Sequence, residues 1–231
     1  STVNPMWLLR TLPNNVLCHV GIRHAIKGPN ACITNQCNMK CRYCACPTLP
    51  PDDLPTEDWL AVIRGLGRYG LSRLKFQGGE PTQRPDFNRL TAEAKSLGMI
   101  TAVASNGTFI KDRPELLDAV DEIIITLNSL RKDVQDDLRG EGSFDAILRT
   151  IDIARARGVK VFNNMVVNKK NYAEVEAVLE DCERRGVVFH AQPVVFGRAF
   201  FDSSAKALQL SAEETRSLNL RLAEWKRRGR R

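Results

Sequence analysis

The sequence predicts an α/β protein whose parallel strands form a partial (β/α)6 barrel. Six apolar, strand-like segments alternate with amphipathic helical segments along the 231 residues, and several of the helical segments end at a glycine. Strict alternation of strands and helices indicates a parallel sheet with the helices outside it. Six units are too few for a closed eight-stranded barrel, so an open or partial barrel follows.

The first strand is expected at residues 31–34, directly before a cysteine-rich loop. Thr56 is expected to cap the first helix, because acidic residues fill the turn after it, and Gly70 ends that helix. Short apolar runs rich in β-branched residues mark the other strands. These are expected at residues 74–77, 100–104, 122–127, 159–167 and 187–195.

The remaining helices are recognised by their first residues and by an apolar face. Two are expected to begin near prolines, two to be capped by a serine or an asparagine, and the last to open with a capping box. These starts are Pro85, Pro114, Ser143, Asn171 and the segment Ser211-Ala212-Glu213-Glu214.

We expect a helical lead-in over residues 1–30, a core domain over 31–200, and a C-terminal helix over 201–231 that could lead into an extension. The composition, 43% hydrophobic and 26% charged, is that of a globular protein, and the apolar runs are too short for a transmembrane helix. The net charge is +7, and many of the basic residues lie near the C-terminal end. They could form the solvated face of a helix, or they could attract an acidic or phosphate-bearing partner. Few aromatic residues interleave with it, so no dedicated nucleic-acid surface is predicted.

The cysteines carry the main chemical signal. Cys37, Cys41 and Cys44 have the spacing C-x3-C-x2-C, and three thiolates this close are good ligands for a soft metal centre with one open position. Structural zinc with Cys46 as fourth ligand is the alternative, although such sites usually take two separated ligand pairs. The odd total of seven unevenly spread cysteines predicts a reducing, cytoplasmic compartment.

Two further motifs follow expected strands. Gly78-Gly79-Glu80 comes after the second strand and Ser105-Asn106-Gly107 after the third, as the cysteine loop comes after the first. The carboxyl ends of parallel strands share one edge, so these loops are expected to meet. Glycines allow a ligand close to the backbone, and a carboxylate suits a cationic group. A ligand site beside the metal is therefore predicted.

The cysteine motif, with Tyr43 before its last cysteine and Gly78-Gly79-Glu80-Pro81 after the second strand, resembles the radical S-adenosylmethionine (SAM) superfamily over roughly residues 31–200. Three segments resemble one branch of it, which contains the molybdenum-cofactor enzyme, viperin and the peptide maturases. They are residues 34–41, the fourth-strand segment 125–129 and the fifth-strand segment 162–167.

The resemblance implies that Cys37, Cys41 and Cys44 hold a [4Fe–4S] cluster whose open iron binds the amino and carboxylate groups of SAM. It implies further contacts with SAM from several elements. Tyr43 would lie near the adenine; Gly78, Gly79 and Glu80 would receive the amino group; Ser105, Thr126 and Asn164 would touch the ribose, sulfonium side or carboxylate; Gln192 would face the adenine or the substrate. Thr126 and Asn128 depart from the Ser and Asp that are usual in the branch, but keep their hydrogen-bonding ability.

The implied function is that of a radical SAM enzyme. It would cleave SAM reductively to a 5′-deoxyadenosyl radical and abstract hydrogen from an unidentified peptide, nucleotide or lipid-precursor substrate. An electron donor such as flavodoxin or ferredoxin would supply the electron. Basic residues flank apolar ones within residues 1–30, so peripheral membrane contact is a further option. The competing hypothesis is a non-catalytic zinc- or cluster-binding interaction protein.

Overall fold

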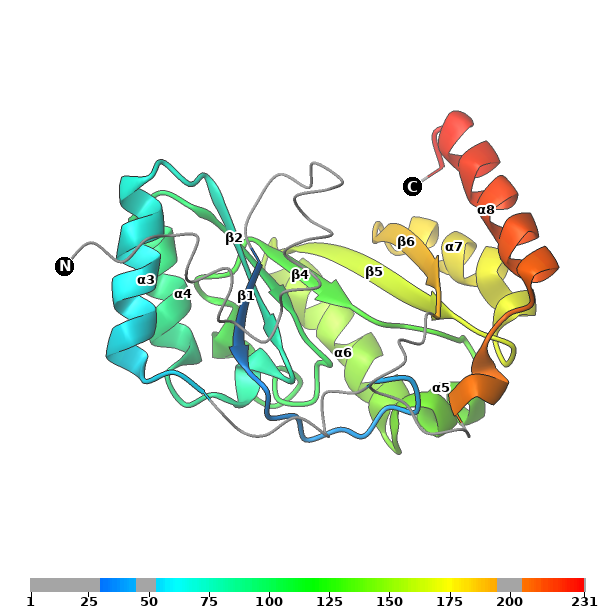
Figure 1. Ribbon diagram of the computed structural model, residues 1–231, viewed down its shortest axis with the longest axis horizontal. Coiled ribbons are helices and arrows are strands. Elements are labelled where there is room, and N and C mark those ends of the chain that lie inside the picture. The colour runs from blue at the N-terminus through cyan, green and yellow to red at the C-terminus, as the bar shows by residue number, and fades with distance from the viewer. Residues whose placement is uncertain (1–29, 45–52, 195–204, 231) are drawn as a thin grey trace.

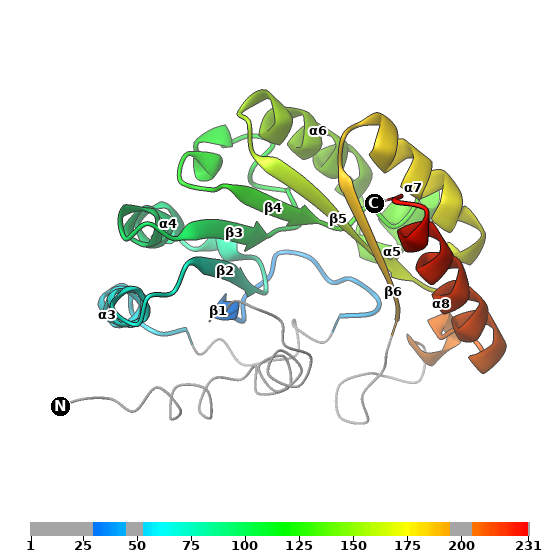
Figure 2. The ribbon, with the colours of Figure 1, turned by 90° about the horizontal axis from the view of Figure 1, so that it is seen from above.

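The computed structural model describes residues 30–44, 53–194 and 205–230. Its centre is one parallel sheet in which each strand pairs with the next along the chain, and Figure 2 shows the sheet curving into an arc. The strands are β1 (Asn30–Thr34), β2 (Arg73–Gly78), β3 (Ile100–Ala104), β4 (Glu122–Ile125), β5 (Lys160–Val167) and β6 (Val188–Pro193). Within the described ranges β1 and β6 do not pair, so the predicted partial barrel is confirmed.

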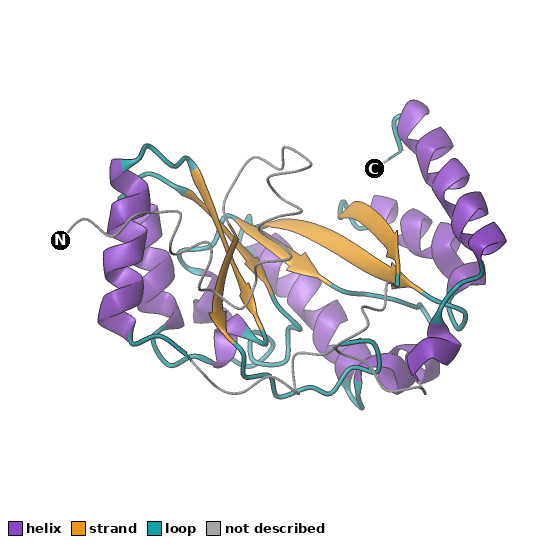
Figure 3. Cartoon of the chain, viewed as in Figure 1, coloured by secondary structure: helices purple, strands orange, loops and turns teal. Residues whose placement is uncertain are grey.

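Helices cover the outer, convex face of the sheet (Figures 1 and 3). The helices there are α3 (Thr56–Arg68), α4 (Phe87–Ser96), α6 (Ser143–Ala156) and α7 (Val175–Arg184). Two more lie beside the β6 half: α5 (Lys132–Arg139) and α8 (Ala212–Arg227). Short 3-10 turns complete the connections: η2 (Pro81–Gln83), η3 (Pro114–Leu117), η4 (Tyr172–Glu174) and η5 (Ala205–Leu208). None of the helices in the described ranges is long and apolar enough to span a membrane.

The hydrophobic core lies between the sheet and these helices. Alternate residues of each strand point into it, as Leu74 and Phe76 of β2 do with no exposed surface. The intervening residues, Lys75 and Gln77 in the same strand, point to the concave face and are only partly buried. The concave face therefore carries the polar side chains that the core excludes.

β4 is shorter than the predicted segment 122–127, for a specific reason. Leu127 N–H donates to the side-chain oxygen of Asn163 at 2.8 Å, and the Asn163 amide donates to Leu127 C=O at 3.0 Å. An asparagine side chain thus replaces the backbone partner, and the regular strand ends at Ile125. The chain beyond that point turns across the carboxyl edge.

Several predicted helix starts were wrong in detail. Thr56 does not cap α3, since its hydroxyl donates to Asp86 at 2.7 Å, and α4 begins at Phe87 rather than Pro85. Gly142, at φ 78°, precedes α6, while Ser143 is bonded to Asp136. At these positions the side chain forms a hydrogen bond with a residue of another element and therefore does not cap the helix. The same holds for Asn171 before η4, whose amide donates to Asn128 C=O.

Other expectations on the helices had different outcomes. The capping box of Ser211 and Glu214 at α8 is confirmed. The sequence did not predict α5, a short and highly charged helix. The predicted lead-in over residues 1–30, Asn30 apart, lies outside the described residues, as does Cys46. The proposed division into three parts stays a prediction.

Asn163→Ala should lower the free energy of unfolding by about 3 kcal/mol, because it leaves the buried N–H and C=O of Leu127 without partners. Urea denaturation of the full chain measures the change. The matched control is Asn88→Ala, whose exposed amide makes one long bond of 3.5 Å and should change stability by less than about 0.5 kcal/mol. Equal losses in the two variants would contradict the assigned role of Asn163.

Candidate active site at the carboxyl edge of the sheet

The cysteine loop leaves β1 and crosses the carboxyl edge toward α5 (Figures 1 and 2). Its beginning is held by Asp53, which follows the loop in the chain. The Asp53 carboxylate accepts hydrogen bonds from the Thr34 hydroxyl at 2.7 Å and from Asn35 N–H at 3.0 Å. The far end of the loop is held by Arg42 N–H, which donates to Leu138 C=O of α5 at 3.0 Å. The loop is therefore anchored before its first cysteine and again between its second and third cysteines.

Gly78 and Gly79 continue the pairing of β1 with β2 beyond the sheet. Gly79 N–H donates to Thr34 C=O and Glu80 N–H to Gln36 C=O, both at 2.8 Å. A Cβ on Gly78 would lie 2.1 Å from the Thr34 oxygen, and one on Gly79 2.0 Å from the Gln36 oxygen. Backbone approach to the cysteine loop thus requires both glycines, whatever ligand binds there.

Glu80 is fully buried and joins two strand-end loops. Its carboxylate accepts hydrogen bonds from the Thr82 N–H at 3.1 Å, the Ser105 hydroxyl at 2.8 Å and the Asn106 N–H at 2.6 Å, and also from the Thr82 hydroxyl. Burial raises the pKa of this carboxyl, while the bonds that it accepts oppose the rise. The Glu80 side chain therefore fixes the loop after β2 to the loop after β3.

Asn106, whose N–H donates to Glu80, also contacts the first cysteine. Its amide donates to Asn38 Oδ1 at 2.9 Å and to Cys37 Sγ at 3.9 Å, and Met39 N–H donates to the same sulfur at 3.4 Å. Two donors on one sulfur favour its thiolate form. Sequence reasoning placed Ser105-Asn106-Gly107 at this edge but gave Asn106 no role. Only its contacts with the cysteine loop reveal that role.

Cys37, Cys41 and Cys44 are free thiols on one loop. The pKa of Cys37 is raised to about 11, mainly by burial and also by Glu80 and the other two thiols, while the hydrogen bond from Met39 N–H opposes the rise. Burial also raises the pKa of Cys41, against the opposing effect of Arg139. Within the described ranges no group of three or more His, Cys, Asp or Glu side chains is arranged to hold a metal ion. The assignment of the three cysteines as ligands therefore stays a prediction. A cation bound among the thiols would remove their mutual repulsion, so the donor set fits a metal centre.

Arg139, which the sequence reasoning missed, supplies a buried positive charge beside this loop. One of its NH groups donates to Thr126 C=O at 3.3 Å, its Nε has no partner, and no ion pair of the described residues includes it. Burial opposes its charge, yet the anionic forms of Tyr43 and Cys41, the Glu80 carboxylate and a hydrogen bond with Tyr43 raise the pKa of this guanidinium. An anionic group at the carboxyl edge would provide its missing partner.

Tyr43 is fixed in the same region. Its hydroxyl oxygen accepts a hydrogen bond from the Asn128 amide at 2.7 Å, and its ring packs against Val134, Leu138 and Leu208. Burial raises the pKa of this phenol to about 12. Asn128 therefore positions Tyr43 by donating from its side-chain amide. An aspartate, the usual residue at this position in the branch that the sequence resembles, has no such N–H donor.

The other predicted contact residues are only partly brought together. Ser105 is bonded to Glu80, and Thr126 offers its carbonyl to Arg139. Asn164 of β5 and Gln192 of β6 lie on the concave face, next to His190 and Val166 respectively in the strand register. Among the described residues no hydrogen bond or ion pair joins Asn164 or Gln192 to the cysteine loop, so their roles stay predictions.

The fold and the site define the class: a parallel partial barrel with a loop of three free thiols at the carboxyl edge of its sheet. The chain belongs to the radical SAM superfamily, whose family model matches residues 32–182. Members of this family are enzymes that use a [4Fe–4S] cluster and SAM. The family resemblance predicted from the sequence is thereby confirmed.

Relatives with known names support this assignment. The chain is 31% identical over 206 residues to the Fe-coproporphyrin III synthase of Methanosarcina barkeri, covering 81% of this chain and 51% of that protein. It is 32% identical over 201 residues to the sporulation killing factor maturation protein SkfB of Bacillus subtilis, covering 84% and 48%. The chain thus spans about half the length of the curated relatives it matches.

A solved structure agrees in fold. Streptococcus suis SuiB, crystallised with S-adenosylmethionine, superposes with a TM-score of 0.73 at 20% identity, over 97% of this chain and 54% of that one. At this level of sequence identity the similarity supports the fold assignment alone. It agrees with the open, six-stranded arrangement described above.

Glu80→Ala should lower the free energy of unfolding of the cofactor-free chain by about 3 kcal/mol or more, because four buried donors lose their acceptor. Chemical denaturation measures this directly. Glu57→Ala removes an exposed carboxylate that pairs with Arg89, and it should change stability by less than about 1 kcal/mol. A Glu80 variant as stable as the Glu57 variant would show that the two loops do not depend on this carboxylate.

Proposed function

We propose that this chain is the catalytic core of a radical SAM enzyme, with a [4Fe–4S] cluster on Cys37, Cys41 and Cys44 and with SAM beside it at the carboxyl edge. One observation supports the proposal beyond family membership: the buried guanidinium of Arg139 next to the thiol loop forms no ion pair with a described residue, and its Nε has no hydrogen-bond partner. A buried cation without an ion pair is costly, and the Glu80 carboxylate, whose field reaches Arg139, is already engaged by other donors. Both the thiolate-bound cluster and the SAM carboxylate are anions that would offset the charge of Arg139.

When bound, the cluster and SAM supply the chemistry: one electron cleaves a carbon–sulfur bond of SAM, giving methionine and a 5′-deoxyadenosyl radical that takes a hydrogen atom from the substrate. The electron comes from a donor such as flavodoxin or ferredoxin. The substrate is a small molecule or a peptide. A peptide is supported by the relative named as a maturation protein, whereas the relative named as a porphyrin synthase supports a small molecule.

The residues of this chain would bind and orient these groups. Arg139, held by Thr126 C=O, would pair with the SAM carboxylate. Asn106 orients Cys37 through its amide, and Glu80 keeps Asn106 in place from below. Tyr43 would border the adenine, its hydroxyl already occupied by Asn128. Positioning of this kind leaves the hydrogen abstraction itself to the cofactor.

The carboxyl edge also separates two roles in space. The cysteine loop covers the edge between β1 and α5, while the concave face below it presents Asn164 and Gln192 from β5 and β6. We assign the edge to SAM and the concave face to the substrate. A radical formed at the edge would then meet a substrate held in the barrel, shielded from bulk water.

Anaerobically purified and reconstituted protein should contain about four irons per chain and form 5′-deoxyadenosine from SAM after reduction. Cys41→Ala should abolish the brown colour and the product, as iron analysis and chromatography would show. The control is Cys182→Ala, because this buried core cysteine lies in α7, and the variant should keep both properties. Zinc without iron in the wild-type protein would overturn the proposal and favour a non-catalytic interaction protein.

Arg139→Met should weaken SAM binding by about 10- to 100-fold, because a charge-assisted hydrogen bond to the carboxylate is lost. Equilibrium dialysis of the reconstituted protein under anaerobic conditions provides the dissociation constant. Without cofactors the variant should be at least as stable as the wild type, since a buried, unpaired charge is removed.

Arg131→Met is the matched control for Arg139. Its guanidinium is exposed, lies at the start of α5 and pairs with Glu174 at 3.4 Å, so SAM affinity should change by less than about twofold. Unchanged SAM affinity in the Arg139 variant, combined with a loss of stability, would assign Arg139 a purely structural role.

A further inference from the structure

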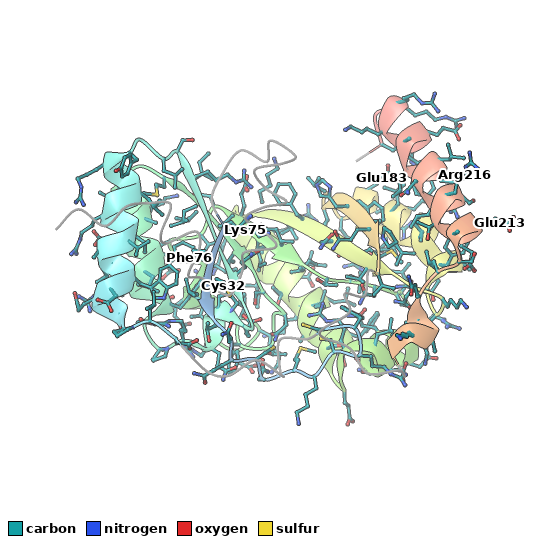
Figure 4. All side chains as sticks on the ribbon, in the orientation of Figure 1. Cys32, Lys75, Phe76, Glu183, Glu213 and Arg216 are labelled. Atoms are coloured by element: carbon teal, nitrogen blue, oxygen red, sulfur yellow. The ribbon has the colours of Figure 1, made fainter. Side chains whose placement is uncertain are left out.

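The segment that leads into the first cysteine is held by one carboxylate. Asp53 accepts hydrogen bonds from three consecutive residues that directly precede that cysteine. The donors are the Thr34 hydroxyl at 2.7 Å, Asn35 N–H at 3.0 Å and the Gln36 side-chain amide at 3.1 Å. Figure 4 labels Cys32 of β1, which lies just before this segment, and Phe76 of the neighbouring strand β2. The place of the first cysteine therefore depends on where Asp53 is held.

The same segment meets the Gly-Gly-Glu motif through its main chain. Gly79 N–H donates to Thr34 C=O and Glu80 N–H donates to Gln36 C=O, both at 2.8 Å. Thr34, whose carbonyl faces Gly79 and whose hydroxyl faces Asp53, is buried. A shift of this segment would therefore change the position of the first cysteine relative to the motif.

Arg84 holds Asp53 in place. Its guanidinium lies 3.8 Å from the Asp53 carboxylate and forms an ion pair with Asp86 at 2.6 Å. It also donates to Ile33 C=O at 2.8 Å and to Leu54 C=O at 3.2 Å. The side chains of Arg84 and Asp53 are only 9% and 17% exposed, so salt and water screen their attraction little. Arg84 therefore joins β1, the chain before α3 and the start of α4 at one point.

The ion pair between the second and third cysteines differs in its exposure. Arg42 pairs with Asp137 of α5 at 2.8 Å, but these side chains are 47% and 41% exposed. An exposed pair contributes little, because water and salt screen it. The side chains that control the position of the loop are therefore concentrated at its beginning.

We propose that Asp53 and Arg84 are positioning residues of this site: they fix residues 34–36 and so set the place of the first cysteine relative to the Gly-Gly-Glu motif. A carboxylate is required, since an amide at position 53 would turn N–H groups toward at least one of the three donors. A guanidinium is required, since its planar fork serves several acceptors at once and an ammonium group cannot span them. The consequence for SAM binding rests on the proposed function.

Hydrogen exchange of the cofactor-free full chain tests the positioning role without a cluster. Asp53→Asn should raise the exchange rate of peptides covering residues 34–41 by about tenfold or more, because the contacts of this segment with the carboxylate are disrupted. Exchange in α6 and β5 should stay within about twofold of the wild type. A merely structural loss would raise exchange throughout the fold instead.

SAM affinity of the anaerobically reconstituted protein is the second measurement. Asp53→Asn should weaken SAM binding by about tenfold in equilibrium dialysis, because the cysteine loop and the Gly-Gly-Glu motif no longer keep their relative positions. Arg84→Lys should weaken it as well, since it keeps the charge but loses the fork of donors.

Glu93→Gln is the matched control. It breaks a bidentate ion pair with Arg64 that also joins α3 and α4, but this pair is more exposed and makes no hydrogen bond with the cysteine loop among the described residues. Both the exchange of residues 34–41 and the SAM affinity should stay within about twofold of the wild type.

The inference fails if Asp53→Asn leaves exchange of residues 34–41 unchanged, raises exchange equally throughout the chain, or loosens the loop without weakening SAM binding. Equal effects of Asp53→Asn and Glu93→Gln would also overturn it. Its failure is separate from that of the proposed function. Wild-type SAM affinity and 5′-deoxyadenosine formation in the Asp53 variant would refute only the positioning role. A loop loosened by Asp53→Asn in a protein that assembles no iron cluster would support the positioning of the thiols and refute the radical chemistry.

Discussion

The site depends on the contact between two backbone segments that only glycine permits. Gly78 and Gly79 pass so close to Thr34 and Gln36 that a single added carbon would lie about 2 Å from a carbonyl oxygen. This contact extends the pairing of β1 and β2 beyond the sheet and brings Glu80 beneath the next strand-end loop. Through Glu80 the position of the first cysteine is linked to β3, and so to the rigid part of the fold.

The carboxyl edge is electrostatically unfavourable without its cofactors. It gathers a fully buried carboxylate, a buried guanidinium without an ion-pair partner among the described residues, and two thiols, Cys37 and Cys41, whose pKa values are raised by burial and by neighbouring thiols. Such a combination destabilises an empty site, because Arg139 and the thiols have lost water without gaining a full partner, whereas Glu80 is compensated by the donors around it. A cluster and a zwitterionic cosubstrate carry charges of the signs required to restore balance. The family membership and the physical chemistry of the site therefore lead to the same conclusion by separate routes.

Much of the fold could be predicted from the sequence, because alternation of strands and helices is a local property of hydrophobic pattern. The meeting of Cys37, Gly79 and Ser105 at one edge followed from parallel topology alone. What could not be predicted depends on long-range partners. Arg139 lies in an eight-residue charged helix with only two apolar residues, Val134 and Leu138, and its burial without an ion pair among the described residues appears only after folding. The lost caps at Thr56 and Asn171 have the same cause, since each side chain found a tertiary partner instead.

The hydrogen bond from Arg42 N–H to Leu138 C=O has a consequence for how freely this loop can evolve. It joins main-chain atoms, so any residue except proline at position 42 can make it. The loop between the second and third cysteines is thus secured against α5 without specifying a side chain. The exposed side chain at position 42 is free to change size and charge, and with it the surface offered to an electron donor, while the main-chain bond keeps the loop in place.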